Sequence, residues 1–270
     1  MNIRAAIAAC KARYIAEGGK ESTWIGDYAK IYKHLDQDRP LTGERLSRLV
    51  QRWPPNTKTR NRACMAANKL AKFHGLDWHA GKLKGKYKPS PVDPLTIPSD
   101  KVIAAEFHRL KNPGWRWVYG AIATYGLRPH EALRGHGQNF DDEELFFHVP
   151  QDTKTGARLV LPLYPEWFYS FQIRKVRLPS LDWNRDNSAL GHSATEYFGD
   201  TARIPFNLYA LRHAWARRAY EFGIDDAIAS LMMGHGVEVH RQHYKTWFDR
   251  QQLRAVLHGA LTNPDRPKPP

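Results

Sequence analysis

The chain has 270 residues, of which 42% are hydrophobic, and a net charge of +14, so it is long enough for one large domain or two smaller ones with buried cores. No apolar run approaches the roughly 20 residues of a membrane span, and the N-terminal apolar patch is too short for a signal peptide. The two cysteines, Cys10 and Cys64, exclude a disulfide framework, so we expect a cytoplasmic, reducing environment.

The positive charge is concentrated in the first third of the chain. Residues 1–90 contain 19 Lys and Arg against 7 Asp and Glu, a net charge of +12, whereas residues 91–270 carry only +2. A basic lobe of this kind favours a polyanionic partner, of which nucleic acid is the commonest. An anionic membrane would also accept such a surface.

The first 82 residues predict a basic helical domain. Apolar residues recur at helical spacing over 23–35, a short helix is expected from Thr42 to Val50, and Pro54-Pro55 ends it. A basic helix then begins at Asn56-Thr57 and ends near Gly75. Residues 83–98 are rich in Pro and Lys and predict an extended linker, which is either a strap along a phosphate backbone or an ordinary charged connection. The candidate DNA contacts of both segments are Lys58, Arg60, Arg62, Lys69, Lys82, Lys84, Lys86 and Lys88.

Residues 99–262 predict a second domain. Ser99-Asp100 is a good helix N-cap, followed by helices over 101–110 and 115–125. Two strands are expected over 145–149 and 158–163, whereas 164–205 has no clear periodicity. Helices return over 208–222 and from Asp225-Asp226 to Met232. A further helix over 249–261 would carry an apolar stripe, and residues 263–270 are expected to be disordered. Its stripe residues are Leu253, Val256, Leu257 and Leu261.

The second domain contains residues suited to cleaving a phosphodiester without a metal. Such a reaction needs fixed donors for the negative transition state, a nucleophile, and a proton for the leaving oxygen. Arg128 follows Gly126-Leu127 at the expected end of a helix, and Glu131 lies three residues later. Taken alone, this spacing is also typical of an ordinary Arg–Glu ion pair on the surface of a helix.

The segment 208–244 supplies the remaining candidates. Tyr209, Arg212 and His213 share one face of a helix, His235 follows Gly234, and Tyr244 comes nine residues later. The guanidinium of Arg212 either binds a phosphate or extends into water. Tyr244 is either a nucleophile or a partly exposed aromatic residue. Nearby cations would favour the phenolate of a tyrosine, whose ordinary pKa is about 10.

Lys154 stands in the expected hairpin turn Thr153-Lys154-Thr155-Gly156, where it either donates a proton to a leaving oxygen or is simply solvated. The histidines His235, His240 and His243 lack the ligand spacing of a zinc site, so no metal is expected. No Walker or dinucleotide-binding motif is present, and we expect no cofactor.

Five fragments of the second domain, taken in their order along the chain, resemble the tyrosine recombinase (phage integrase) family. They are Arg128 with Glu131, a hairpin lysine, the sequence Leu211-Arg212-His213, Gly234-His235 and a tyrosine nine residues later. The resemblance covers about residues 99–247, and the first domain and linker resemble that family's core-binding domain in pattern. It implies a mainly α fold with a small β-hairpin, arranged as a two-domain, C-shaped clamp on DNA.

The resemblance also implies a site-specific recombinase with a role for each motif residue. Tyr244 would form a 3′-phosphotyrosyl link, Arg128 and Arg212 would hold the non-bridging oxygens, and His235 would hydrogen-bond the phosphate. Lys154 would protonate the 5′-oxygen, with Glu131 and His213 in supporting positions. The partner would be double-stranded DNA, and four protomers would exchange strands through a Holliday junction, dissociating to monomers or weak assemblies off DNA.

The chain departs from that family's pattern at Tyr209, where histidine is usual, and at Met233, where leucine is usual. Tyrosine can hydrogen-bond but carries no positive charge, so acid–base help from position 209 is in question. The alternatives are a type IB topoisomerase-like relaxase and a DNA-binding protein of the same fold with impaired catalysis. A prokaryotic, phage or mobile-element origin is expected.

Overall fold

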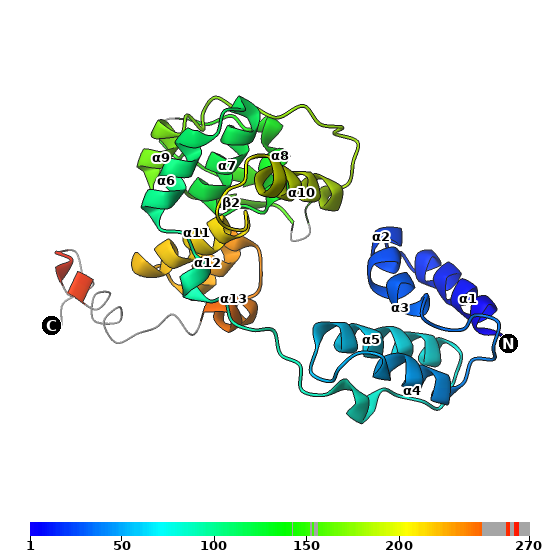
Figure 1. Cartoon of the computed structure of the whole chain (residues 1–270). Coiled ribbons are helices and arrows are strands. Elements are labelled where there is room, and N and C mark those ends of the chain that lie inside the picture. Colours follow the sequence, from blue (N-terminus) through cyan, green and yellow to red (C-terminus); the bar gives the residue numbers. More distant parts are fainter. Residues whose placement is uncertain (142, 152, 154–155, 245–257, 260–261, 265–270) are drawn as a thin grey trace. The chain divides into compact units, whose positions relative to one another are not determined.

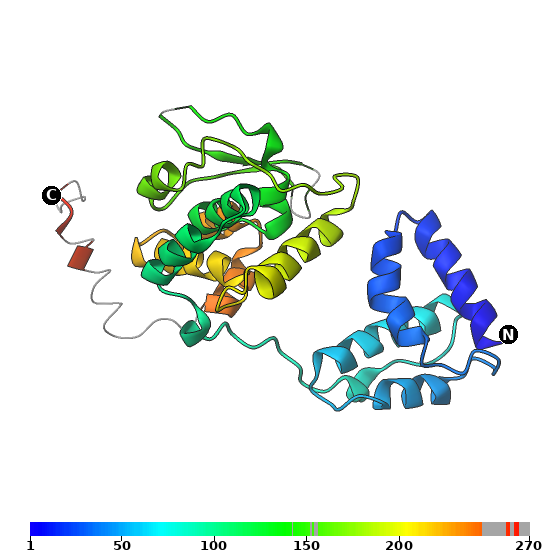
Figure 2. The ribbon, with the colours of Figure 1, turned by 45° about the horizontal axis from the view of Figure 1, so that its top comes forward.

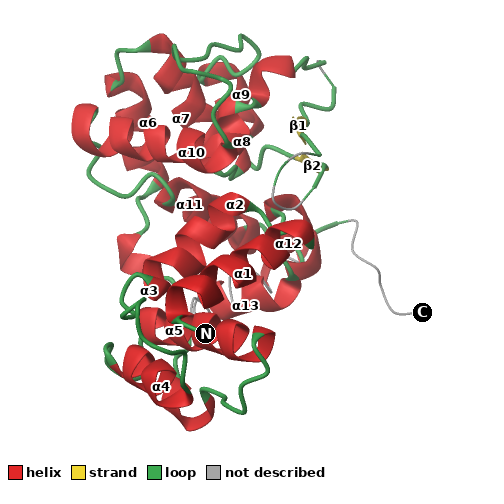
Figure 3. Cartoon of the chain, turned by 90° about the vertical axis from the view of Figure 1, so that its right-hand side faces the viewer, coloured by secondary structure: helices red, strands yellow, loops and turns green. Residues whose placement is uncertain are grey.

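The computed structural model describes all residues except 142, 152, 154–155, 245–257, 260–261 and 265–270. The chain divides into two compact units, Met1–Ser90 and Pro91–Pro270. As the sequence predicts, the fold is mainly helical with a small antiparallel sheet (Figure 3). None of the described helices has the length and apolar character needed to cross a membrane.

The first unit is built from helices (Figure 1). Two threonines begin its longer predicted helices as N-caps: the Thr42 and Thr57 side chains accept hydrogen bonds from the backbone N–H groups of Arg45 and Arg60. Its elements are α1 (Ile3–Ala16), α2 (Glu21–Thr23), the π-helix η1 (Trp24–Ala29), α3 (Lys30–Tyr32), α4 (Gly43–Gln51), α5 (Lys58–Phe73) and the 3₁₀ turn η2 (Gly81–Lys84).

Helices α4 and α5 lie side by side, as Figures 1 and 2 both show. Small residues of α5, including Ala63, Cys64 and Ala67, are buried and let the neighbouring helices approach closely. The sequence did not single out α1, because its buried residues, Ile3, Ala6 and Cys10, give little hydrophobic periodicity.

The helix predicted over 23–35 is interrupted by the π-helix η1. Its wider turn accompanies the packing of aromatic rings: Trp24 lies 5.3 Å from Tyr28 and 5.7 Å from Tyr32, centroid to centroid. Tyr14 of α1 packs against the same group, 5.6 Å from Trp24. A pattern with a 3.6-residue period cannot reveal such a turn, because the extra residue shifts the spacing only locally.

The second unit surrounds α7, whose residues 114–125 are all buried except Arg116. Helices α11 and α6 pack against α7, and α10 packs against α8 (Figure 2). The elements are η3 (Pro94–Thr96), α6 (Asp100–Arg109), α7 (Pro113–Tyr125), α8 (Pro129–Leu133), η4 (Gly135–Gly137), β1 (Phe147–Val149), β2 (Arg158–Val160), α9 (Pro165–Ser170), α10 (Asn187–Glu196), η5 (Tyr197–Thr201), α11 (Ala210–Glu221), α12 (Asp226–Met233) and α13 (Val237–Tyr244).

The two predicted strands pair antiparallel, with Phe147 opposite Val160, although both are shorter than predicted. The stretch 164–205, which showed no clear periodicity, contains α9, α10 and η5. All four residues of the predicted C-terminal stripe, Leu253, Val256, Leu257 and Leu261, lie outside the described residues.

Candidate active site

Two helices of the second unit end at glycines in the left-handed conformation, Gly126 after α7 and Gly234 after α12. A Cβ at Gly126 would lie 2.7 Å from the Trp215 side chain, so this position requires glycine for both its φ of 64° and its packing. The chain therefore turns sharply after α7 and places Arg128 at the start of α8.

Three arginines from different elements bind three consecutive carbonyl oxygens at the end of α12. Arg158 Nε donates to Met232 at 2.7 Å, Arg212 Nη2 donates to Met233, and Arg128 Nη2 donates to Gly234 at 2.6 Å. The last carbonyls of a helix lack partners within the helix and form the negative end of its dipole, so they stabilise cations. The end of α12 thus gathers three guanidinium groups.

Glu131 joins two of these arginines. Its carboxylate accepts hydrogen bonds from Arg128 Nη1 at 2.8 Å and Arg158 Nη2 at 2.7 Å, and its side chain is fully buried. Burial alone would raise its pKa, but the hydrogen bond and charge of Arg158, together with Arg128, lower the pKa of Glu131 to about 2. Glu131 is therefore ionised at neutral pH and orients both guanidiniums.

Arg212 is buried in the second unit, with 1% of its surface exposed. Its Nη1 donates to the Gly126 carbonyl at 2.6 Å, and Nη2 lies 3.5 Å from His235 Nδ1. Burial lowers its pKa from the ordinary arginine value, and no described carboxylate forms an ion pair with it. A buried cation held mainly by neutral carbonyls is one that a bound anion would stabilise.

His235 and His240 form a hydrogen-bonded pair, with 2.9 Å between His235 Nε2 and His240 Nδ1. Burial first, and then the charge of Arg212, lower the pKa of His235 to about 3. Burial also lowers the pKa of His240. Both rings are therefore neutral at pH 7, and one proton bridges the two nitrogens. His235 is consequently held in place next to Arg212.

Tyr244 ends α13 and is 7% exposed. Its hydroxyl lies 3.0 Å from His213 Nδ1, and its ring meets that of His240 edge to face at 4.7 Å. Burial raises the pKa of Tyr244, whereas the charge of Arg212 lowers it by less. The phenol is therefore protonated at neutral pH in the protein without DNA.

Tyr209 differs from the other predicted site residues because its side chain is 40% exposed. It stands at the N-cap of α11, with its ring centroid 5.2 Å from that of His213. The Arg212 guanidinium carbon lies 6.0 Å from the Tyr209 ring centroid. Tyr209 thus borders the site, and no described hydrogen bond involves its hydroxyl.

The structure brings together Arg128, Glu131, Arg212 and His235, and joins Tyr244 to His213, whereas Lys154 lies outside the described residues. Sequence reasoning missed Arg158, which it had treated only as the start of a strand. The signal that could have revealed it is the place of Arg158 in the strand, two residues before Val160 and therefore on the same, buried face. In the described part of the chain, no cluster of His, Cys, Asp or Glu is arranged to hold a metal ion.

The candidate DNA-contacting residues of the first unit fall into different environments. Arg62 pairs with Asp27 at 3.1 Å, and Lys69 lies 4.8 Å from the Tyr14 ring centroid. Arg60 is buried and donates to the carbonyls of Leu83 and Trp53, so it stabilises the fold and is not available to a phosphate. The exposed members are Lys58, Lys82, Lys84, Lys86 and Lys88.

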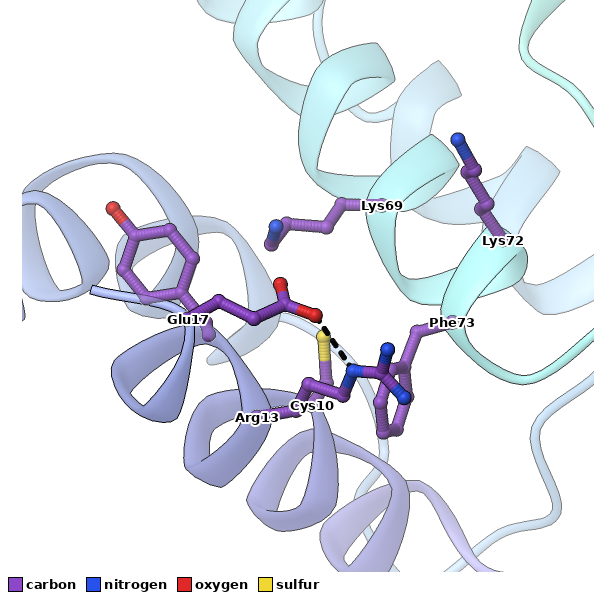
Figure 4. A pocket seen from close by; sticks show the side chains of 7 residues that line it. Cys10, Arg13, Glu17, Lys69, Lys72 and Phe73 are labelled. Atoms are coloured by element: carbon purple, nitrogen blue, oxygen red, sulfur yellow. Dashed lines mark hydrogen bonds and ion pairs between the residues drawn. The ribbon is translucent and has the colours of Figure 1, made fainter. Parts of the chain in front are cut away.

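Lys69 also lines a pocket of about 380 Å³ between α1 and α5 (Figure 4). Lys72 and Arg13 border the same pocket, and Arg13 pairs with Glu17 at 2.6 Å. The Phe73 ring and the Cys10 thiol form its apolar part. This face of the first unit therefore combines positive charge with aromatic surface.

Comparison with known proteins gives relatives for part of the chain. Residues 5–84 match the family model of the XisA/XisC excisase second domain. Excisase A of Nostoc sp. (strain PCC 7120 / SAG 25.82 / UTEX 2576) is 33% identical over 162 residues, covering 55% of this chain and 34% of that protein. Excisase C of the same strain is 35% identical over 159 residues, covering 55% and 32%. The chain spans about a third of the length of these relatives.

Solved structures resemble the fold over most of the chain. A lambda integrase dimer bound to a COC′ core site gives a TM-score of 0.66 at 14% identity, covering 93% of this chain and 99% of that one. A lambda integrase tetramer on a Holliday junction gives 0.61 at 13%, covering 87% and 78%. XerH site-specific recombinase bound to its difH substrate gives 0.57 at 16%, covering 93% and 83%.

Proposed function

Because the chain has the fold of the tyrosine recombinases, as its sequence predicts, we propose that it is a site-specific DNA recombinase. It would cleave and rejoin strands through a 3′-phosphotyrosyl intermediate on Tyr244. Its partner would be double-stranded DNA, with four protomers acting together on two synapsed duplexes. Among the proteins that share the fold, lambda integrase and XerH are described in complex with DNA.

The observation that carries this proposal is the arginine cluster at the end of α12. Glu131 binds Arg128 and Arg158, whereas the buried Arg212 is held by the carbonyls of Gly126 and Met233 and lies beside His235. Arg212 is thus a buried cation without an ion-pair partner among the described carboxylates. A phosphate with two non-bridging oxygens would complete the site, since guanidiniums bind such oxygens through paired hydrogen bonds.

The chemistry needs no external energy source. The Tyr244 oxygen forms a bond to phosphorus while the bond from phosphorus to the 5′-oxygen breaks, and Lys154 gives the leaving oxygen its proton. Arg128 and Arg212 would stabilise the extra negative charge of the transition state. His235 would hydrogen-bond the phosphate when the anion replaces one of its contacts, to Arg212 or to His240. The phosphotyrosyl bond conserves the energy of the phosphodiester, so a new 5′-hydroxyl can attack it and restore the DNA.

The basic first unit would supply most of the sequence-independent affinity for DNA. Lys58, Lys69 and the lysines of residues 82–88 would neutralise phosphates and release counterions. Binding of the full chain to duplex DNA should therefore weaken steeply with salt. A flat salt response would exclude this role for the first unit.

Covalent capture tests the proposal directly. The protein is incubated with fragmented DNA in EDTA, denatured, and any protein-linked DNA is recovered and sequenced to locate the attachment sites. A nicked substrate built on that site lets the cleaved fragment diffuse away, so that the adduct accumulates. We expect an adduct that Tyr244→Phe abolishes and that Tyr169→Phe, a change at an exposed tyrosine of α9, leaves intact. Failure to form any adduct on a verified binding site would exclude the catalytic function.

The relatives in Nostoc are named excisases, which favours excision as the direction of reaction. A plasmid carrying two copies of the mapped site in direct orientation tests this. Excision predicts loss of the intervening segment as a circle. Relaxation of supercoils by monomers, without exchange between sites, would instead support a topoisomerase-like activity.

A further inference from the structure

The Tyr244 hydroxyl contacts an ionisable side chain, that of His213. The distance from His213 Nδ1 to Tyr244 Oη is 3.0 Å, and the two rings meet edge to face with centroids 5.8 Å apart. His213 follows Arg212 directly on α11, whereas Tyr244 ends α13. The contact therefore joins the tyrosine to the helix that carries the buried arginine.

The surroundings of His213 favour a neutral ring. Burial first, and then the charges of Arg212 and His243, lower the pKa of His213 to about 4. The Tyr209 and Tyr244 rings cover it from the start of α11 and from α13. No described group hydrogen-bonds to its Nε2, so that nitrogen can hold the ring proton and leave Nδ1 as an acceptor.

We propose that His213 is the base of strand cleavage, which receives the phenol proton of Tyr244 on Nδ1 as the tyrosine oxygen attacks phosphorus. This inference rests on the function proposed above. In the cleavage step the O–H bond of Tyr244 breaks, a bond from Oη to phosphorus forms, and the 5′-oxygen leaves with a proton from another donor. In rejoining, the protonated His213 returns its proton to the departing phenol oxygen.

The other described groups near the tyrosine are less suited to this role. His235 directs Nδ1 toward Arg212 and Nε2 toward His240, so neither nitrogen contacts the phenol. His240 likewise uses Nδ1 in that pair and meets Tyr244 through its ring. Tyr209 is itself a phenol and a weak base. His213 would therefore act as the base in place of the histidine that is usual at position 209 in tyrosine recombinases.

Single-turnover cleavage of the nicked substrate measures the role. His213→Asn should slow adduct formation by about 100-fold or more at pH 7, as expected for loss of a general base. His192→Asn, a change at an exposed histidine of α10, is the matched control and should leave the rate unchanged. DNA affinity and thermal melting are measured for each variant, so that misfolding is recognised.

A substrate with sulfur in place of the bridging 5′-oxygen separates the two proton transfers, because a thiolate leaves without protonation. This substrate should restore cleavage by Lys154→Ala but not by His213→Asn. The rate for the wild-type protein should level off well below the pKa of Tyr244, whereas His213→Asn should gain about tenfold per pH unit. This wild-type profile serves as the test if the variant does not fold.

Three outcomes are decisive in different ways. No adduct with the wild-type protein would remove the proposed function itself. An adduct that His213→Asn forms at the wild-type rate would overturn the role of His213 alone. A slow variant with an unchanged pH profile, or one restored by the sulfur substrate, would also overturn it, because either result assigns His213 to structure or to the leaving group.

Discussion

Two arginine clusters of the second unit each contain one fully buried guanidinium, Arg218 or Arg212, and differ in how that charge is compensated. In the first, Asp100 Oδ1 accepts hydrogen bonds from Arg217 at 2.9 Å and Arg218 at 2.8 Å, and Glu221 lies 3.4 Å from Arg217. In the second, Glu131 binds Arg128 and Arg158, while Arg212 is bound by carbonyls. We call the Asp100 cluster balanced, because its buried Arg218 is paired with a carboxylate. We call the Glu131 cluster unbalanced, because its buried Arg212 is bound by neutral groups among the described residues.

The groups that surround the two buried guanidiniums, Arg218 and Arg212, also differ. The Arg218 guanidinium carbon lies 4.7 Å from the Trp167 ring centroid and 5.3 Å from that of Tyr164, so aromatic rings close the site. Arg212 instead faces His235 and lies near the half-exposed Tyr209. The balanced cluster, which aromatic rings close, stabilises the fold. The buried guanidinium of the unbalanced cluster would be stabilised further by a bound anion.

The largest effect is expected from Glu131→Gln. Removing the carboxylate leaves Arg128 and Arg158 buried with less compensation, which should lower the free energy of unfolding by about 3–5 kcal/mol. Urea unfolding at pH 7 measures this change. Binding of a DNA oligonucleotide that carries the mapped site should recover part of the lost stability, since its phosphate supplies negative charge to the same arginines.

The same variant changes how stability depends on pH. The pKa of Glu131 falls from an ordinary value of 4.5 to about 2, so its stabilisation is complete above pH 4.5 and is lost as the pH falls toward 2. We expect the wild-type protein to lose roughly 3 kcal/mol more than Glu131→Gln over that window, because each pKa unit is worth about 1.4 kcal/mol. Parallel pH profiles for the two proteins would show that the carboxylate is not stabilised by its arginines.

Arg212→Lys should mainly reduce cleavage. A lysine keeps one positive charge but loses the planar set of donors that contacts two carbonyls and His235. We expect the barrier to strand cleavage to rise by about 3 kcal/mol, as for loss of a donor to the transition state, with duplex affinity changed less than threefold. Single-turnover cleavage and a binding titration separate the two. An equal loss in both would mean that Arg212 acts in binding only.

Asp100→Asn is the matched change in the balanced cluster. It weakens hydrogen bonds to Arg217 and Arg218, and about 2 kcal/mol of unfolding free energy should be lost, since hydrogen bonds to charged groups contribute on that scale. Cleavage per folded molecule should not change at a temperature where the variant is folded. A cleavage defect as large as that of Arg212→Lys would remove the distinction between the two clusters.

The sequence predicted the helical fold because caps and periodicity are local properties. Thr42, Thr57 and Ser99 accept hydrogen bonds from the helix starts where the pattern placed them. It also named Arg128, Arg212 and His235, because their order along the chain carries information that spacing alone does not. The sequence predicted helix for the first domain without separate bounds for α1, since the buried residues of α1, Ile3, Ala6 and Cys10, have weak periodicity.

The partners that hold the site could not be predicted from the sequence. Tertiary packing brings Arg158 to the carbonyls of Met232, Met233 and Gly234. Because every residue has a backbone carbonyl, the sequence does not show which of them will bind an arginine. The same is true of Arg60, whose basic side chain suggested a DNA contact but is bound to two carbonyls within the first unit. Burial, which decides between a structural and a binding arginine, depends on residues far apart in the chain.

The smallest effect is expected from Tyr209→His. The side chain is 40% exposed and no described hydrogen bond uses its hydroxyl, so its removal should change stability by less than about 0.5 kcal/mol. The new imidazole would stand beside His213 and could donate to the phosphate, so cleavage should be at least as fast as in the wild-type protein, with a gain below about tenfold. Single-turnover rates at pH 6 and 8 measure this gain, which should be larger at pH 6, where a histidine of ordinary pKa is more often protonated. A large loss would instead show that the tyrosine hydroxyl binds the DNA, and the unbalanced cluster would then extend to the start of α11.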